Sequence, residues 1–256
     1  GIGSWSNLSG GYRNFLINAG FNYAQRLATP SFTTIVTDAY GADRFKCLSQ
    51  NSSFQYNRAD ALGESSLTSS YYGVFKKTVG AGKTMIIQPI EGIDSIPLRS
   101  KTVTFQAMLK GTTSSTYRMG VIELQTAGTV DTIPTVISAW GANTVDPTLG
   151  ANLAFISGTQ SKSVTTSWTK FSVTVTIPST SKNIIPAIWS NSQMALNEEL
   201  HVAEVGFYIS PTEITWIPTA PSTDYTACLR FCERMIMRSD NLTYFPIGFA
   251  FSPNAA

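Results

Sequence analysis

The chain has 256 residues, of which 43% are hydrophobic and 13% charged, and its formal net charge at pH 7 is +2. This composition excludes intrinsic disorder, and the lack of a three- or seven-residue period excludes collagen and coiled coils. The 18 basic and 16 acidic residues produce no strong field, and the densest basic cluster is only Lys76-Lys77, so nucleic acid is not an expected partner.

Membrane and export signals are missing from the sequence. Its apolar runs are short, such as Met85-Ile86-Ile87, whereas a spanning helix needs about 20 residues. Residues 1–20 have neither a basic start nor a continuous apolar centre, so we expect no signal peptide. The chain begins with Gly1 rather than methionine, which suggests a processed protein or a piece of a longer one.

In chain order, residues 1–12 come first; they are rich in Gly and Ser and predict an extended arm or linker. From residue 13 to 219 the apolar residues recur with period two. In Phe171–Ile177, four apolar residues alternate with three hydroxyl residues, and Lys101–Leu109 alternates in the same way. This alternation is typical of antiparallel strands with one face in a core and the other in water.

Further short segments of the same kind are separated by Gly, Pro, Asn and Asp. The further expected strands are 31–37, 70–78, 84–88, 117–125, 135–140, 153–157, 184–190 and 201–209. About ten short strands at this spacing predict an all-β fold, an antiparallel β-sandwich of the jelly-roll type over residues 13–219.

Residues 220–256 break the period of two. A run after Pro221 repeats at helical spacing and predicts a short amphipathic helix over 223–237. Its expected apolar stripe is Tyr225, Cys228, Leu229, Cys232, Met235 and Ile236.

A terminal strand is expected after this helix, at 244–251, and it lacks a hairpin partner. Exposed apolar edges are avoided in monomers, so we expect residues 238–256 to pack on other copies of the chain, in a trimer, with the arm 1–12 docking similarly. The expected oligomer contacts are Trp5, Phe245, Ile247, Phe249 and Phe251.

The three cysteines are Cys47, Cys228 and Cys232, and an odd number argues against a disulfide framework. The spacing of Cys228 and Cys232 suits two thiols packed in a helix, and their pairing state stays open. A zinc site is not expected, because the single histidine, His201, has no neighbouring ligand in the sequence.

Catalytic motifs are weak. His201 lies in an alternating strand without a Gly-x-Ser-x-Gly elbow, so a Ser–His–Asp triad is not expected. Two carboxylates of a glycosidase pair cannot be placed by sequence alone. The candidates for that chemistry, which otherwise suit turns and solvated strand positions, are Glu91, Asp94, Glu123, Asp131, Asp146, Glu198, Glu199 and Glu204.

Cofactor motifs are also missing. The segment 80–84 ends in Gly-Lys-Thr, but a phosphate-binding loop also needs a Gly where Lys77 stands, so we interpret Gly80–Lys83 as a hairpin turn. We therefore expect no cofactor. A structural calcium stays open, because backbone carbonyl ligands leave no local motif.

Aromatic residues near expected strand ends suggest a sugar-binding surface, since exposed rings stack on pyranose rings and polar side chains bind hydroxyls. These aromatic residues are Tyr71, Tyr72, Trp140, Trp168, Trp189 and Trp216. The candidate glycan-binding set is Tyr71, Tyr72, Trp140, Asn143 and Asp146. In the alternative interpretation, Trp140 closes the end of the core and Asp146 begins a turn before Pro147.

Several stretches, in order, carry a resemblance to a known family. They are Arg13–Arg26, with Asn-Phe-Leu-Ile-Asn at its start, then Ala42-Asp-Arg-Phe45, Gln88-Pro-Ile-Glu-Gly92, Lys101–Phe105, Ser167–Pro178, Val205–Tyr208, Trp216-Ile-Pro218 and Asp224–Phe231. Together they resemble bacteriophage tail-fibre and virion-decoration domains. Phe45 and Phe231 stand where that family usually has Trp and Tyr, and relatives continue into another β-segment after the helix.

The resemblance implies a carbohydrate-binding-module-like jelly roll on the surface of a phage particle, trimeric and in contact with other virion proteins. Three functions follow. The first is a non-enzymatic tail-fibre or spike module for host adsorption through surface glycans. The second is a capsid decoration or cement protein that stabilises the head lattice. The third, disfavoured because no internal repeat of a β-helix is present, is a polysaccharide depolymerase.

Overall fold

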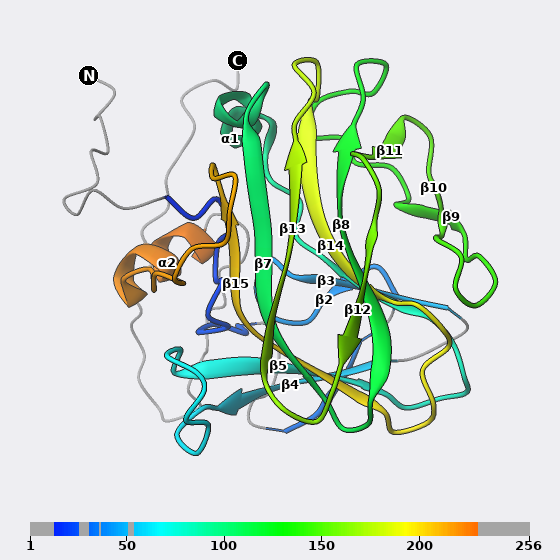
Figure 1. The fold of residues 1–256 in the computed structure, drawn as a ribbon, viewed down its shortest axis with the longest axis vertical. Helices are drawn as coiled ribbons and strands as arrows, with labels where there is room; N and C mark the ends of the chain where they lie inside the picture. The colour runs from blue at the N-terminus through cyan, green and yellow to red at the C-terminus, as the bar shows by residue number, and fades with distance from the viewer. Residues whose placement is uncertain (1–12, 26–30, 36, 51–53, 230–256) are drawn as a thin grey trace, which may run out of the picture.

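The computed structural model describes residues 13–25, 31–35, 37–50 and 54–229. Two antiparallel sheets pack face to face as a β-sandwich, and a short helix follows near the C-terminus (Figure 1). The predicted all-β jelly-roll fold is confirmed. The expected oligomer contacts lie outside the described residues: Trp5, Phe245, Ile247, Phe249 and Phe251.

The first sheet has six strands, and these include the first and the last strand of the sandwich in chain order. Its order is β1 (Thr33–Ile35), β4 (Phe54–Asp60), β5 (Tyr71–Lys77), β15 (Glu199–Tyr208), β7 (Thr102–Gly111) and β13 (Thr169–Thr176). Neighbours pair antiparallel throughout.

The second sheet faces the first across the core. Its order is β11 (Leu153–Phe155), β8 (Ser115–Leu124), β14 (Asn183–Ser190), β6 (Thr84–Ile87), β3 (Lys46–Ser49) and β2 (Ala39–Tyr40), with β12 (Gln160–Val164) on the other half of β8. The remaining elements are a ribbon of β9 (Ile137–Ala139) and β10 (Thr148–Leu149), and the helices α1 (Gly92–Ser95), η1 (Ile96–Leu98) and α2 (Pro221–Leu229).

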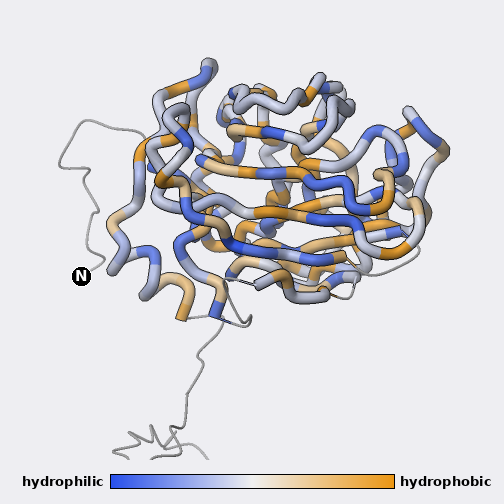
Figure 2. Tube along the Cα trace, turned by 90° about the horizontal axis from the view of Figure 1, so that it is seen from below, coloured by the Kyte–Doolittle hydropathy of each residue, from blue (hydrophilic) through white to orange (hydrophobic). Residues whose placement is uncertain are grey.

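Alternation along the strands explains which residues enter the core, and hydrophilic and hydrophobic positions follow one another along them (Figure 2). On β7, Val103, Phe105 and Leu109 point into the core as predicted. The opposite face of β7 was expected in water, and that expectation is wrong, because Thr104 and Gln106 are buried. The segment after β15 covers them, with the Gln106 amide exchanging two hydrogen bonds with the backbone of Ile214.

The N-terminal segment 13–25 has no strand but completes the core. Phe21 is fully buried, stacks on Phe45 with ring centroids 4.7 Å apart, and meets the edge of Phe75 at 6.1 Å. The Phe21 ring packs directly on the backbone of Gly73, where a side chain would not fit: a Cβ added at Gly73 would lie 2.8 Å from the ring.

Three side-chain amides hold this segment in place. Asn14 bonds the backbone of β15 at Val205 and Phe207, and Gln88 exchanges two hydrogen bonds with the backbone of Ile17. Asn18, also fully buried, bonds backbone groups of the same segment and of the turn before β3.

A second hydrophobic cluster lies on the outer face of the second sheet. The excursion between β8 and β12, residues 125–159, folds back over that face and carries β9 and β10 (Figure 1). The buried members of this outer cluster are Leu48, Met85, Ile87, Ile122, Leu124, Val136, Leu153, Ile185, Ala187 and Trp189. The molecule therefore has two cores, one between the sheets and one under the excursion.

Two local expectations need correction. Gly80–Lys83 does not join a hairpin, because β5 belongs to the first sheet and β6 to the second, so the turn crosses between sheets. Helix α2 begins at Pro221, earlier than predicted, and the predicted residues 230–237 lie outside the described part. In its expected apolar stripe, Cys228 is buried but Tyr225 is 42% exposed.

Helix α2 docks on the N-terminal segment through a ring contact between Tyr225 and Tyr23, whose centroids lie 5.2 Å apart, and through a polar contact. The buried Asp224 carboxylate accepts hydrogen bonds from the Asn18 backbone, at 2.6 Å, and from the Asn22 amide, at 3.2 Å. Burial raises the pKa of this carboxyl. No helix within the described residues is long and apolar enough to span a membrane.

Candidate functional site

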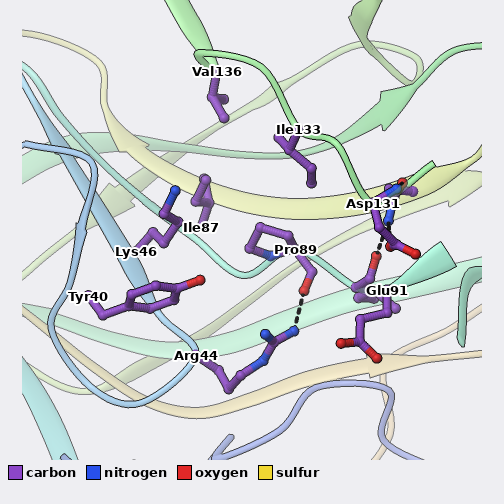
Figure 3. A pocket seen from close by; sticks show the side chains of 11 residues that line it. Tyr40, Arg44, Lys46, Ile87, Pro89, Glu91, Asp131, Ile133 and Val136 are labelled. Carbon is purple, nitrogen blue, oxygen red and sulfur yellow. Dashed lines mark hydrogen bonds between the residues drawn. The ribbon is translucent and has the colours of Figure 1, made fainter. Parts of the chain in front are cut away.

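A hollow of about 320 Å³, here named the first hollow, opens on the outer face of the second sheet beside β2 and β3. From one wall to the other, its main side chains are Tyr40, Arg44 and Lys46, then Ile87 and Pro89, then Glu91 and Asp131 (Figure 3). Ile133 and Val136 of the excursion close it from above. The hollow thus has cations on one wall, carboxylates on the other and an apolar floor.

Strand register explains the wall formed by Tyr40 and Lys46. These two residues are directly paired between β2 and β3, as are Ala39 and Cys47. Because Cys47 enters the main core, the alternate residues Tyr40 and Lys46 point outward into the hollow. Lys46 Nζ lies 2.8 Å from Asp38 Oδ1 and 5.8 Å from the centre of the Tyr40 ring.

Arg44 joins the same wall from the turn between β2 and β3. Its φ is 74°, in the left-handed region that non-glycine residues seldom adopt, and such strain costs about 1–3 kcal/mol. Its guanidinium donates from Nη2 to the Pro89 carbonyl at 2.8 Å (Figure 3). The side chain is therefore held against the floor of the hollow rather than in solvent.

The opposite wall is organised around Asp131. Its Oδ1 accepts the Gly92 N–H at 2.7 Å and the Asn183 amide at 2.7 Å, while its own N–H donates to Asn183 Oδ1 at 2.9 Å. The Asp131 side chain is exposed, and its Oδ2 has no hydrogen-bond partner among the residues that the structure describes. One oxygen fixes the carboxylate, and the other is available to a hydroxyl donor.

A second hollow of about 250 Å³ adjoins the first, and Val136 lines both. Its lining residues are Thr37, Asp38, Leu48, Ser49, Thr135, Val136, Ile137 and Trp140. The half-buried Trp140 packs against the outer cluster at its edge.

The predicted set of Trp140, Asn143 and Asp146 does not converge on one ligand. Asn143 Oδ1 accepts the backbone N–H of Gln193, and Asp146 is engaged by Arg118 at 2.5 Å and by the Thr159 hydroxyl at 2.6 Å. Trp140 lines the second hollow, whereas Asp146 holds its own loop. Asp146 does not begin a turn before Pro147 either; it follows the turn at 142–145, and its carboxylate holds the loop through Arg118 and Thr159.

This loop is fixed from below by a buried lysine. Lys83 is 1% exposed, and its ammonium donates to the carbonyls of Ala142, at 2.5 Å, and Val145, at 2.7 Å. Burial lowers the pKa of Lys83, with a further contribution from the nearby Arg118 charge. The loop that follows Trp140 is thus tied to the start of β6.

Tyr71 and Tyr72 point to opposite faces of the first sheet, far from both hollows in the fold. Tyr71 packs against the main core beneath the Arg58 guanidinium, 4.4 Å from its ring centre. Tyr72 points outward, where it meets Trp168 edge-on at 5.3 Å and the His201 ring at 5.5 Å. The two tyrosines therefore belong neither to one surface nor to the site of Trp140.

The remaining candidate aromatic and acidic residues also lie in different parts of the structure. Trp189 and Trp216, expected near strand ends or loops, are core residues with 1% and 6% exposure. Of the candidate carboxylates, Glu91 and Asp131 line the first hollow. Glu198 and Glu204 are buried; Glu198 accepts hydrogen bonds from side chains of β8 and from a nearby backbone N–H, and Glu204 accepts them from Thr68 and Ser69. No cluster of three or more His, Cys, Asp or Glu that suits a metal occurs in the part of the chain that the structure describes.

His201 is expected to make stability depend on pH. Burial lowers the pKa of His201, and this effect outweighs that of the Glu199 carboxylate, which raises the pKa from 3.0 Å away from Nε2. The Lys110 charge lowers the pKa further, and the Glu64 charge raises it. Between this lowered pKa and the ordinary value of 6.5, the unfolded chain binds more protons than the folded one, so stability falls as the pH falls through that window.

The measurement is a melting curve at pH values from about 7.5 to about 5. We expect the melting temperature of the wild-type chain to fall more steeply than that of His201→Gln, which cannot titrate. Parallel slopes for the two proteins would contradict the assignment to His201.

Sequence reasoning missed Tyr40 and Lys46, because β2 has only two residues and β3 four, too few for a period to be visible. Arg44 was noticed only as part of a family motif, with no role attached. Glu91 and Asp131 were recognised as carboxylates, but their place on one wall of the same hollow depends on contacts between distant segments. The motifs around Arg44 and Glu91 were the signals in the sequence that pointed to this region.

Comparison with known proteins gives a limited result. No family model and no curated protein matches the sequence. Among solved structures, the chain is similar to a family 61 carbohydrate-binding module in complex with β-1,4-galactotriose (TM-score 0.45, 11% identity, covering 77% of this chain and 99% of the other).

Two further similar structures come from different settings. One is the C-terminal family 22 carbohydrate-binding module of Clostridium thermocellum Xyn10B (TM-score 0.42, 11% identity, covering 70% of this chain and 94% of the other). The other is the enzymatically active domain of bacteriophage CBA120 tailspike protein 4 (TM-score 0.41, 10% identity, covering 77% of this chain and 21% of the other).

Proposed function

We propose that the chain is a non-catalytic glycan-binding module of a bacteriophage particle, of the tail-fibre or spike type, that contributes to host adsorption. Its ligand site is the first hollow. The virion setting is supported by the ordered sequence motifs from Arg13 to Phe231. The proposal includes a trimer, which mass measurement of the intact chain in solution tests.

The observation that carries the proposal is the composition of the first hollow. Its volume of about 320 Å³ falls in the range of about 300–1,000 Å³ that small-molecule sites occupy. Two cations, Arg44 and Lys46, balance two carboxylates, Glu91 and Asp131, so the hollow favours no strongly charged ligand. Donors on one wall, acceptors on the other and the Tyr40 ring suit a neutral, hydroxyl-rich ligand such as a sugar.

The test is binding of glycans to the wild-type chain and to Tyr40→Ala. A glycan array identifies ligands, and calorimetry measures their affinity. Truncating a central aromatic contact costs about 2 kcal/mol, so we expect Tyr40→Ala to weaken binding at least tenfold. Tyr225→Ala, which removes an exposed tyrosine from α2, is the matched control and should bind like the wild type.

Three outcomes would contradict parts of this proposal separately. Wild-type binding that Tyr40→Ala leaves intact would move the site elsewhere. New reducing ends in a polysaccharide incubated with the chain would point to a depolymerase, with Glu91 and Asp131 as the carboxylates to replace. Antibody labelling of the capsid rather than the tail of intact particles would favour the cement function.

A further inference from the structure

The two hollows lie end to end along the edge of the second sheet. Moving along β3 from Lys46 to Ser49 leads from the first hollow into the second. The excursion runs the same way, with Asp131 and Ile133 over the first hollow and Ile137 and Trp140 over the second. A strand rises about 3.3 Å per residue, so Lys46 and Ser49 stand about 10 Å apart.

An ion pair marks the boundary between the hollows. Lys46 lines the first and Asp38 the second, with Nζ and Oδ1 2.8 Å apart. Asp38 keeps 56% of its side chain exposed, and its φ is 62°. A ligand that crosses this boundary meets a donor and an acceptor side by side, an arrangement suited to the hydroxyls of adjoining sugar rings.

The second hollow offers its own aromatic ring. Trp140 is half-buried, with its ring packed against the outer cluster. Leu48 and Ile137 supply apolar wall, and the exposed Thr135 supplies a hydroxyl at the rim. An aromatic ring beside apolar wall and a hydroxyl thus repeats, in the second hollow, the chemistry of Tyr40 and its neighbours.

We infer that the two hollows are adjoining subsites for one linear oligosaccharide of at least two units, with Tyr40 and Trp140 as its two aromatic contacts. The inference rests on the proposed glycan-binding function. It adds that the ligand class is a sugar chain and that affinity grows with chain length until both subsites are filled.

Calorimetry with soluble ladders of xylose, galactose and glucose oligomers, from one to six units, tests the inference on the full chain. For the ladder that binds, we expect wild-type affinity to rise at least tenfold from one unit to the longer oligomers and then to level off. Trp140→Ala should abolish this rise and leave the affinity for the single unit unchanged. Tyr40→Ala should weaken every member of the ladder.

A second variant keeps the test valid if Trp140→Ala fails to fold. Thr135→Lys places a long charged side chain over the second hollow without adding an aromatic face, and it should also abolish the rise. Trp168→Ala, on the first sheet, is the control and should keep the wild-type length dependence.

Affinity that does not depend on chain length, or a loss at Trp140→Ala that is equal for one unit and for six, would overturn the inference and leave the proposed function standing. Absence of binding by every ladder and every arrayed glycan would overturn both.

Discussion

Replacing Phe21 by Ala is expected to lower the free energy of unfolding by about 3–5 kcal/mol, the usual cost of truncating a fully buried phenylalanine. The residue belongs to no strand, yet its ring is buried between Phe45, Phe75 and the bare backbone of Gly73. Because no Cβ at Gly73 can move into the space, the cavity left by the ring stays largely unfilled.

Chemical denaturation followed by tryptophan fluorescence measures this loss. Phe32→Ala is the matched control, since Phe32 is 37% exposed, and such surface changes usually stay within about 0.5 kcal/mol. A loss below about 1 kcal/mol at Phe21 would mean that segment 13–25 is not part of the cooperative core.

The second large effect is expected at Lys83→Met, with a loss of about 2–4 kcal/mol. Met fills the space of the lysine stem but donates no hydrogen bond, so the carbonyls of Ala142 and Val145 lose their partner. Each buried acceptor left without a donor costs about 1–3 kcal/mol, and relief from burying the ammonium offsets part of that cost.

Thermal and denaturant unfolding of Lys83→Met, beside the exposed Lys101→Met, give the measurement. Lys101→Met should match the wild type. A neutral or stabilising result at Lys83 would show that the desolvated charge costs as much as its two hydrogen bonds contribute. Since this lysine fixes the loop after Trp140, the inferred pair of subsites further predicts that binding of long oligosaccharides weakens together with the loss of stability.

Alternation in the sequence predicted the long strands well. In β7 and β13 each side chain belongs to one face, so a period of two reports directly on burial, and Val103, Phe105, Val173 and Val175 lie in the core as expected. The covering of the opposite face of β7 was not predictable in this way. It depends on residues 210–216 returning over the sheet, a contact that leaves no trace in the local pattern of β7.

The candidate site was harder to predict because its walls come from four separate segments. Trp140 was recognised as an exposed aromatic, but its sequence neighbours Asn143 and Asp146 proved to hold their own loop. The contacts that matter, Tyr40 beside Lys46 and Asp131 beside Asn183, are set by strand register and by a side-chain network. Closeness in sequence to Trp140 was therefore a poor guide to the site residues, because contacts between distant segments determine which side chains share a hollow.

The stretches that carry the family resemblance have a structural role that the sequence alone did not reveal. Asn14 and Asn18 bind backbone groups that no strand satisfies, and Gln88 does the same for Ile17. Along segment 13–25, which forms no strand, these side-chain amides supply hydrogen bonds to the backbone that a neighbouring strand would otherwise supply. The motif thus preserves the attachment of that segment, and it says little about the ligand.

The separation of the two cores has a consequence for how such a protein can diversify. One wall of both hollows is a single continuous stretch, 131–140, which rests on the outer cluster and not on the core between the sheets. Exchanges within 131–140 can therefore reshape both hollows without changing a residue of the core between the sheets. Variants that exchange the exposed residues of this stretch and keep the buried Val136 should therefore retain their melting temperature while the lining of both hollows changes.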